Sequence, residues 1–137
     1  MKRIIGTVLA IVVTAVVTRA QDPAKTDADK YRVVLDNAQV RVLDYSDKPG
    51  DKTSMHSHPN HVVYALTSFS RKFTLPDGKT MVREFKPGEV FWLEAQTHAG
   101  ENVGQTDTHV IIVELKESAK EAAPETKGVP KAAKSGQ

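Results

Sequence analysis

Residues 50–64 read Gly-Asp-Lys-Thr-Ser-Met-His-Ser-His-Pro-Asn-His-Val-Val-Tyr. This stretch holds three of the five histidines of the chain, His56, His58 and His61. Because side chains two positions apart on a β-strand point to the same face, the rings of His56 and His58 are expected to lie side by side. The Pro-Asn pair that follows predicts a turn, and His61 opens the next apolar run. The pattern predicts a metal site made of two adjacent rings and a third that arrives across the turn.

The composition limits the class of protein. The chain has 137 residues, which indicates one domain, and it contains no cysteine. Any metal ion would therefore be held by nitrogen and oxygen ligands and not by thiolates. The formal net charge is +2, and the basic residues are scattered among acidic ones, so we expect no nucleic-acid partner.

The N-terminus has the pattern of an export signal. Lys2 and Arg3 precede an almost wholly apolar run over residues 4–17, which is short for a membrane span of about 20 residues. We therefore expect residues 1–20 to be a signal peptide and the mature protein to be periplasmic or secreted, with no membrane contact after cleavage. The alternative is an uncleaved N-terminal membrane anchor.

The rest of the chain is predicted to be all-β. Short apolar runs alternate with Gly, Pro and Asp turns, and Asp77-Gly78 is a strong hairpin signal. The pattern predicts an antiparallel sandwich or small barrel over residues 29–117, after a flexible lead-in at 21–28 and before a disordered tail at 118–137. The expected strands are 31–35, 39–46, 53–58, 61–69, 72–75, 80–85, 90–94 and 108–116, with His98 in a loop over 97–105.

The order and spacing of these residues resemble the cupin superfamily. The first cupin motif has a Gly, five residues and His-x-His, as in Gly50, His56 and His58. His61 stands where that motif has a Glu, and the closing Gly of the motif is absent. The second motif matches in His98, three residues and Asn102, but residues 94–96 read Glu-Ala-Gln in place of Pro-x-Gly. The resemblance covers residues 33–115, and the chain is similar to small single-domain conserved-barrel cupins, including those of beta-alanine degradation.

The resemblance implies a fold and a metal centre. The fold would be an antiparallel double-stranded β-helix, or jelly-roll barrel, and the metal ligands would be His56, His58, His61 and His98. Neutral imidazole suits iron, manganese, nickel, copper and zinc. Without a carboxylate ligand the ion would keep its full charge, which favours a small anionic molecule as its partner.

Three functions stay open at this point. Cupins with only histidine ligands include dioxygenases, so a metal-dependent, dioxygenase-like enzyme that acts on a small molecule is the first. A non-catalytic cupin that binds or senses a small ligand is the second. The third is a structural homodimer that holds metal adventitiously, with the apolar strand over residues 110–113 as a candidate contact.

Several other residues could contribute to the site. His61 is either a ligand or a residue that the shortened turn points away from the metal. Glu94 and Glu101 could replace the missing carboxylate, although exposed glutamates are commoner. The candidate wall residues of the barrel are Val63, Ala65 and either Phe91 or Trp92.

The remaining polar and aromatic residues have simpler interpretations. We expect Asn102 to hold its loop through hydrogen bonds to the backbone. His109 is expected to be structural or exposed, and Trp92 to belong to the core and not to a substrate platform. The Arg71-Lys72 pair is expected to lie on a solvated face.

Overall fold

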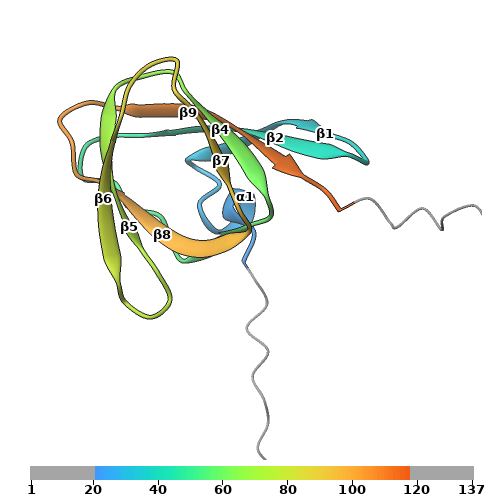
Figure 1. The fold of residues 1–137 in the computed structure, drawn as a ribbon, viewed down its shortest axis with the longest axis horizontal. Coiled ribbons are helices and arrows are strands. Elements are labelled where there is room, and N and C mark those ends of the chain that lie inside the picture. The colour runs from blue at the N-terminus through green and yellow to red at the C-terminus, as the bar shows by residue number, and fades with distance from the viewer. Residues whose placement is uncertain (1–20, 118–137) are drawn as a thin grey trace, which may run out of the picture.

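The computed structural model describes residues 21–117, which form two antiparallel sheets facing each other across a barrel (Figure 1). One sheet has the order β1-β2-β9-β4-β7, and the other has the order β3-β8-β5-β6. This confirms the predicted antiparallel jelly-roll barrel. The elements are α1 (Pro23–Thr26), β1 (Tyr31–Asp36), β2 (Val40–Asp47), β3 (His56–His58), β4 (His61–Ala65), β5 (Phe69–Thr74), β6 (Thr80–Phe85), β7 (Val90–Leu93), β8 (Gln96–Asn102) and β9 (Thr108–Leu115).

The hairpin between β5 and β6 shows how the sequence fixes the local structure. Gly78 has a φ of +83°, a conformation that is strained for residues with a Cβ atom. The Leu75 amide donates to the Lys79 carbonyl at 2.8 Å, and the Gly78 amide donates to the Leu75 carbonyl at 2.9 Å. The predicted Asp-Gly turn is therefore present.

The core lies between the two sheets. Side chains alternate along each strand, so every second residue points into the barrel. In β9, Val110 and Ile112 are buried, whereas Ile111 and Val113 between them are partly exposed. The buried apolar cluster consists of Tyr31, Leu43, Tyr45, Val63, Ala65, Phe69, Phe85, Val110 and Ile112.

The predicted dimer contact at residues 110–113 has another explanation in the fold. β9 lies between β2 and β4, so it is a central strand and not an edge strand. Its apolar character follows from burial on the inner face and partial burial on the outer face. A homodimer stays a prediction.

The predicted strand over residues 61–69 is wrong in its extent. β4 ends at Ala65, and β5 begins at Phe69 in the other sheet. The chain therefore crosses from one sheet to the other between these residues. The Leu66 amide donates to the His109 carbonyl at 2.9 Å, which ties this crossing to β9.

The predicted loop over residues 97–105 is also wrong, because most of it is β8. This strand pairs with β3 on one side and with β5 on the other. Its inner positions are His98, Gly100 and Asn102, all buried, and none of them is a large apolar residue. The strand therefore lacks the apolar alternation by which a half-buried strand is recognised.

The segment before the first strand is not a flexible lead-in throughout, because it contains a short helix. Residues 21–28, predicted to be a flexible lead-in, contain α1, whose N-cap Asp22 accepts a hydrogen bond from the Ala24 amide at 3.0 Å. The predicted signal peptide at 1–20 and the predicted tail at 118–137 lie outside the described residues. Between residues 21 and 117, no helix has the length and apolar character needed to cross a membrane.

Candidate metal centre

Three histidines meet at one point inside the barrel. His56 and His58 lie on β3 with their side chains on one face, and His98 lies directly opposite His56 on β8. One candidate ligand atom from each of the three lies within 4.8 Å of the others. Their exposed fractions are 0%, 4% and 6%, so the group lies in the interior. The spacing in the sequence predicted that His56 and His58 lie side by side, whereas His98 was expected at the site only from the resemblance.

Hydrogen bonds orient two of these rings. His56 Nδ1 lies 2.8 Å from the Ser54 carbonyl oxygen, and His58 Nδ1 lies 2.6 Å from Glu114 Oε1. Since both partners are acceptors, each Nδ1 donates, and Nε2 is the candidate metal-binding atom of each ring. A metal-binding histidine is commonly fixed in this way by a partner on its other nitrogen. Tyr31 donates its hydroxyl to His56 Nε2 at 3.2 Å.

His98 supplies a second sign of a ligand site. Its Nδ1 is buried and has no hydrogen-bond partner among the described residues. A buried polar atom without a partner is rare, because its desolvation is not compensated. Three buried imidazoles, two of them held in orientation by hydrogen bonds, form a donor set that fits a divalent transition metal.

His61 lies beside this group and is not one of the three. Its ring centroid is 4.8 Å from that of His58, and its Nδ1 donates to the Pro59 carbonyl at 2.7 Å. It is 2% exposed and lines the barrel cavity. The turn therefore directs His61 inward, into the space beside the three histidines.

Sequence reasoning missed the carboxylate of the site, which is Glu114. Besides His58, Glu114 binds Arg41, whose Nε donates to Oε2 at 2.6 Å. Glu114 follows Thr108, Val110 and Ile112 on the inner face of β9, and it is 2% exposed. An acidic residue on the inward face of an otherwise apolar strand was the signal that could have identified it.

The two glutamates proposed as replacements are elsewhere. Glu94 is exposed. Glu101 points away from the barrel and pairs with Lys72 at 2.5 Å and Lys52 at 3.6 Å. Neither carboxylate approaches the three histidines.

Burial sets the protonation states of the site. It lowers the pKa of His56 to about 4 and that of His98 to about 2, with the neighbouring histidines adding to the effect. Burial alone would raise the pKa of Glu114, but hydrogen bonds from His58 and Arg41 hold it below its usual value. At neutral pH, His56 and His98 are therefore uncharged, as a histidine must be to bind a metal. Glu114 is ionised at the same pH.

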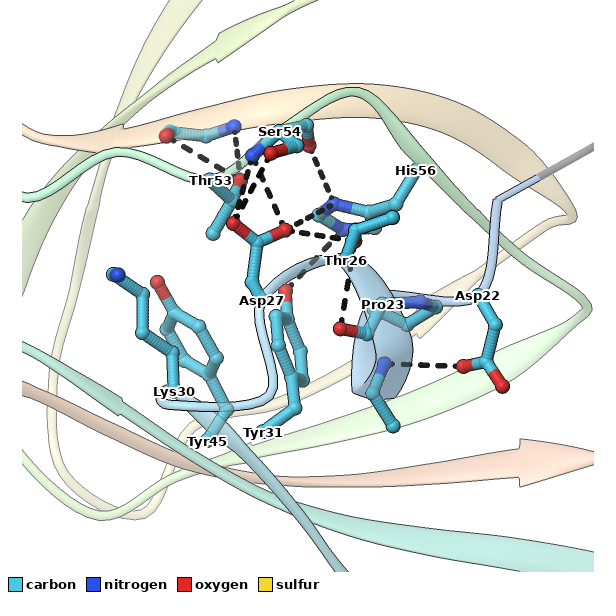
Figure 2. A network of polar contacts seen from close by, with 12 residues as sticks. Asp22, Pro23, Thr26, Asp27, Lys30, Tyr31, Tyr45, Thr53, Ser54 and His56 are labelled. Carbon is cyan, nitrogen blue, oxygen red and sulfur yellow. Dashed lines mark hydrogen bonds and ion pairs between the residues drawn. The ribbon is translucent and has the colours of Figure 1, made fainter.

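The N-terminal segment fixes the position of His56 through contacts of Asp27 with Ser54, as Figure 2 shows. Asp27 accepts hydrogen bonds from the Ser54 amide at 3.0 and 3.1 Å, one to each carboxylate oxygen. The Ser54 carbonyl is the group that orients His56. Asp27 thereby fixes the position of a ring that lies 29 residues further along the chain.

A cavity of about 310 Å³ adjoins the centre. His58, His61 and His98 line one part of it, and most of the remaining wall is apolar. Val63 and Phe91 line it as expected, whereas Ala65 belongs to the core and Trp92 is 55% exposed on the outer face. The prediction that Trp92 is a core residue is therefore wrong.

Arg71 corrects another prediction. It was expected on a solvated face, but it is 5% exposed and lines the cavity. Its Nη1 donates to Asp47 Oδ2 at 2.6 Å, which supplies the counter-charge that burial requires. Lys72, the next residue, points outward to Glu101.

Asn102 and His109 have the expected structural roles. The Asn102 side chain donates to the Thr106 carbonyl at 2.9 Å and accepts from the Gly104 amide at 3.0 Å, which holds the turn before β9. His109 Nε2 lies 2.9 Å from Asp44 Oδ1, outside the barrel site.

Comparison with known proteins gives structural relatives. No protein-family model and no curated protein matches the sequence. A cupin domain from Bordetella pertussis Tohama I has a TM-score of 0.58 and 25% identity, and the match covers 63% of this chain and 91% of that one. A protein with a double-stranded beta-helix domain from Klebsiella pneumoniae has a TM-score of 0.51, 16% identity and coverage of 80% and 93%.

A third structure is a Cupin 2 conserved barrel domain protein from Salinispora arenicola, with a TM-score of 0.51, 17% identity and coverage of 80% and 92%. These likenesses agree with the strand order and show that the chain has the cupin fold, the antiparallel double-stranded β-helix.

Proposed function

We propose that this protein binds one divalent transition metal ion through His56, His58 and His98. The observation that carries the proposal is the approach of three buried imidazoles, with one candidate ligand atom each, to within 4.8 Å of one another. Iron, manganese, nickel, copper and zinc all suit this donor set. His61, whose ring lies beside that of His58, is the candidate for a fourth protein ligand.

The chain's own residues define what can happen at the centre. Glu114 holds the ring of His58, and Ser54 holds the ring of His56, so these two candidate ligands keep fixed orientations in the cluster. The apolar wall keeps water away from a molecule in the cavity. A bound metal would supply a Lewis acid and, for a redox-active ion, a site for oxygen chemistry.

We propose that the partner of the metal is a small anionic molecule and that the protein is an enzyme acting on it. None of the three proposed ligands is negatively charged, and Glu114 acts only through His58, so an anion bound directly to a divalent ion would be favoured. The resemblance to cupins of beta-alanine degradation makes β-alanine one compound for a panel of small carboxylates. Export of the protein is part of the same proposal and follows from the pattern of residues 1–20.

Elemental analysis of the untagged, natively purified protein tests the metal. We expect about one ion per chain, and we expect its loss in His56→Ala and in His98→Ala. His109→Ala is the matched control, because His109 lies outside the cluster. Equal metal content in all four proteins would refute the site.

Turnover needs a separate measurement. Oxygen uptake and product analysis across the panel of carboxylates distinguish an enzyme from a binding protein. Metal-dependent consumption that disappears in His98→Ala supports the enzyme. Metal-dependent binding without any consumption would make the protein a carrier or sensor of a small ligand.

A further inference from the structure

Two arginines are neighbours on adjacent strands of the four-stranded sheet, Arg71 buried and Arg83 exposed to solvent. Arg71 of β5 and Arg83 of β6 are register partners, so they point to the same side, and both line the cavity. Like charges directly opposite each other on a sheet are destabilising. Such a pair is expected only where counter-charges are at hand.

The described residues supply one counter-charge for this pair. Asp47 binds Arg71 at 2.6 Å, and Glu114 is already engaged by Arg41 and His58. Arg83 forms no ion pair with any residue between 21 and 117. Arg71, Arg83 and Asp47 together thus leave one positive charge facing the cavity.

Aromatic rings hold Arg83 in place. Its Cζ lies 4.1 Å from the ring centroid of Phe91 and 5.1 Å from that of Phe85. Stacking of this kind fixes the plane of a guanidinium and leaves its N–H groups free at the edge. A planar, fixed donor edge matches the two oxygens of a carboxylate.

The same aromatic wall continues to the metal centre. Phe85 contacts Phe91 edge-on at 5.0 Å between centroids and Phe73 at 6.4 Å. Phe73 in turn lies edge-on to the ring of His98 at 5.3 Å. A molecule lying on this wall therefore spans from Arg83 toward the histidines.

We infer that the cavity binds a small organic carboxylate with an apolar body, whose carboxylate pairs with Arg83. Its body would lie along Phe85 and Phe73, and its far end would face His98. The volume of about 310 Å³ is at the lower end for ligand pockets, which limits the molecule to a small one. The inference rests on the proposed function only in one respect, which is that the far end of the molecule would meet the proposed metal ion.

Calorimetric titration of benzoate and of its neutral analogue benzamide tests the inference. Arg83→Gln should weaken benzoate binding by about tenfold or more, because a hydrogen-bonded charge pair is lost, and should leave benzamide unaffected. Arg32→Gln is the control with the same change of charge. Arg32 lies on β1, pairs with Asp44, and is 72% exposed in its side chain. Circular dichroism confirms that the variants fold.

The outcomes separate this inference from the metal proposal when the titrations are repeated on chelator-treated protein. Arg83-dependent benzoate binding supports the inference whether or not the protein holds metal. If the natively purified protein holds no metal but still binds benzoate through Arg83, the metal proposal is wrong and the inference stands. Equal benzoate binding by the natural protein and Arg83→Gln overturns the inference. Absence of benzoate binding to the natural protein overturns it as well.

Discussion

At the scale of single residues, Glu114 decides how well the centre is organised. Its carboxylate accepts from His58 Nδ1 at 2.6 Å and is itself held by Arg41. Loss of such a partner typically lowers metal affinity by about 10- to 100-fold. We expect this loss in Glu114→Gln, measured by competition with a chromogenic chelator.

The matched control for this variant is Glu101→Gln. Glu101 lies on the outer face of β8 and pairs with Lys72, so its neutralisation changes charge without touching the site. We expect unchanged metal affinity in this control. Equal affinities of the two variants would mean that Glu114 has no positioning role.

The sequence predicted some of these residues and missed others for a physical reason. His56 and His58 were predictable, because spacing on a strand determines the face on which a ring lies. His98 was expected in a loop, and only the resemblance of its motif pointed to the site. Glu114 and Arg71 were missed because a buried charge is stable only beside its partner. Their partners, His58 and Asp47, lie 56 and 24 residues away.

At the scale of elements, β8 depends on a glycine. A Cβ atom on Gly100 would lie 2.3 Å from Arg71 Nη2, so alanine there would displace the guanidinium from Asp47. Breaking a buried ion pair costs about 3–5 kcal/mol. We expect Gly100→Ala to lower the free energy of unfolding by a few kcal/mol, measured by urea denaturation.

A double-mutant cycle identifies the cause. In an Arg71→Gln background the clash is smaller, so the additional effect of Gly100→Ala should shrink. Ala99→Ser, one residue earlier on the outward face of β8, should change little. Additive effects of Gly100→Ala and Arg71→Gln would show that the clash is not the cause.

The pairing of β3 with β8 buries His56 and His98, and this burial predicts that the stability of the metal-free barrel depends on pH. Burial lowers the pKa of His56 to about 4 and of His98 to about 2, whereas the unfolded histidines titrate near 6.5. Below pH 6.5 the unfolded chain therefore binds protons that the folded chain does not. Stability is complete above this pH and falls as the pH decreases toward 4, by up to about 1.4 kcal/mol per unit for each histidine.

Urea denaturation at pH 7.0, 6.0 and 5.0 with a chelator present measures this slope. His98→Gln should reduce the slope, since one of the depressed groups is gone. An identical slope in His98→Gln would place the pH dependence elsewhere in the molecule.

The errors in the predicted elements share one origin. Sequence patterns report how apolar side chains alternate, and β8 buries His98, Gly100 and Asn102 on its inner face. The crossing between β4 and β5 reads Leu-Thr-Ser over residues 66–68, so no Gly, Pro, Asn or Asp marks the change of sheet. The Asp77-Gly78 hairpin was predictable because the turn itself requires a particular residue.

At the scale of the whole molecule, residues 21–28 join the two sheets at one end of the barrel. Asp22 binds Arg41 of β2 at 2.9 Å, in the five-stranded sheet. The Gln21 carbonyl accepts from the Ser57 amide of β3 at 2.9 Å, and Asp27 accepts from the Ser54 amide, both on the side of the four-stranded sheet. A segment that looked like a lead-in from its polar composition thus closes the fold.

This arrangement predicts that Asp27 affects both stability and the metal centre. Asp27→Ala removes the charged acceptor of the Ser54 amide, and a hydrogen bond to a charged group contributes about 1.5–3 kcal/mol. Because the Ser54 carbonyl orients His56, metal affinity should fall together with stability. Asp29→Ala, whose carboxylate is 72% exposed and pairs locally with Lys30, is the control and should change neither. Urea denaturation of the metal-free proteins measures the stability, and chelator competition of the metal-loaded proteins measures the metal affinity. A loss of stability with unchanged metal affinity would show that the N-terminal segment stabilises the barrel without positioning the site.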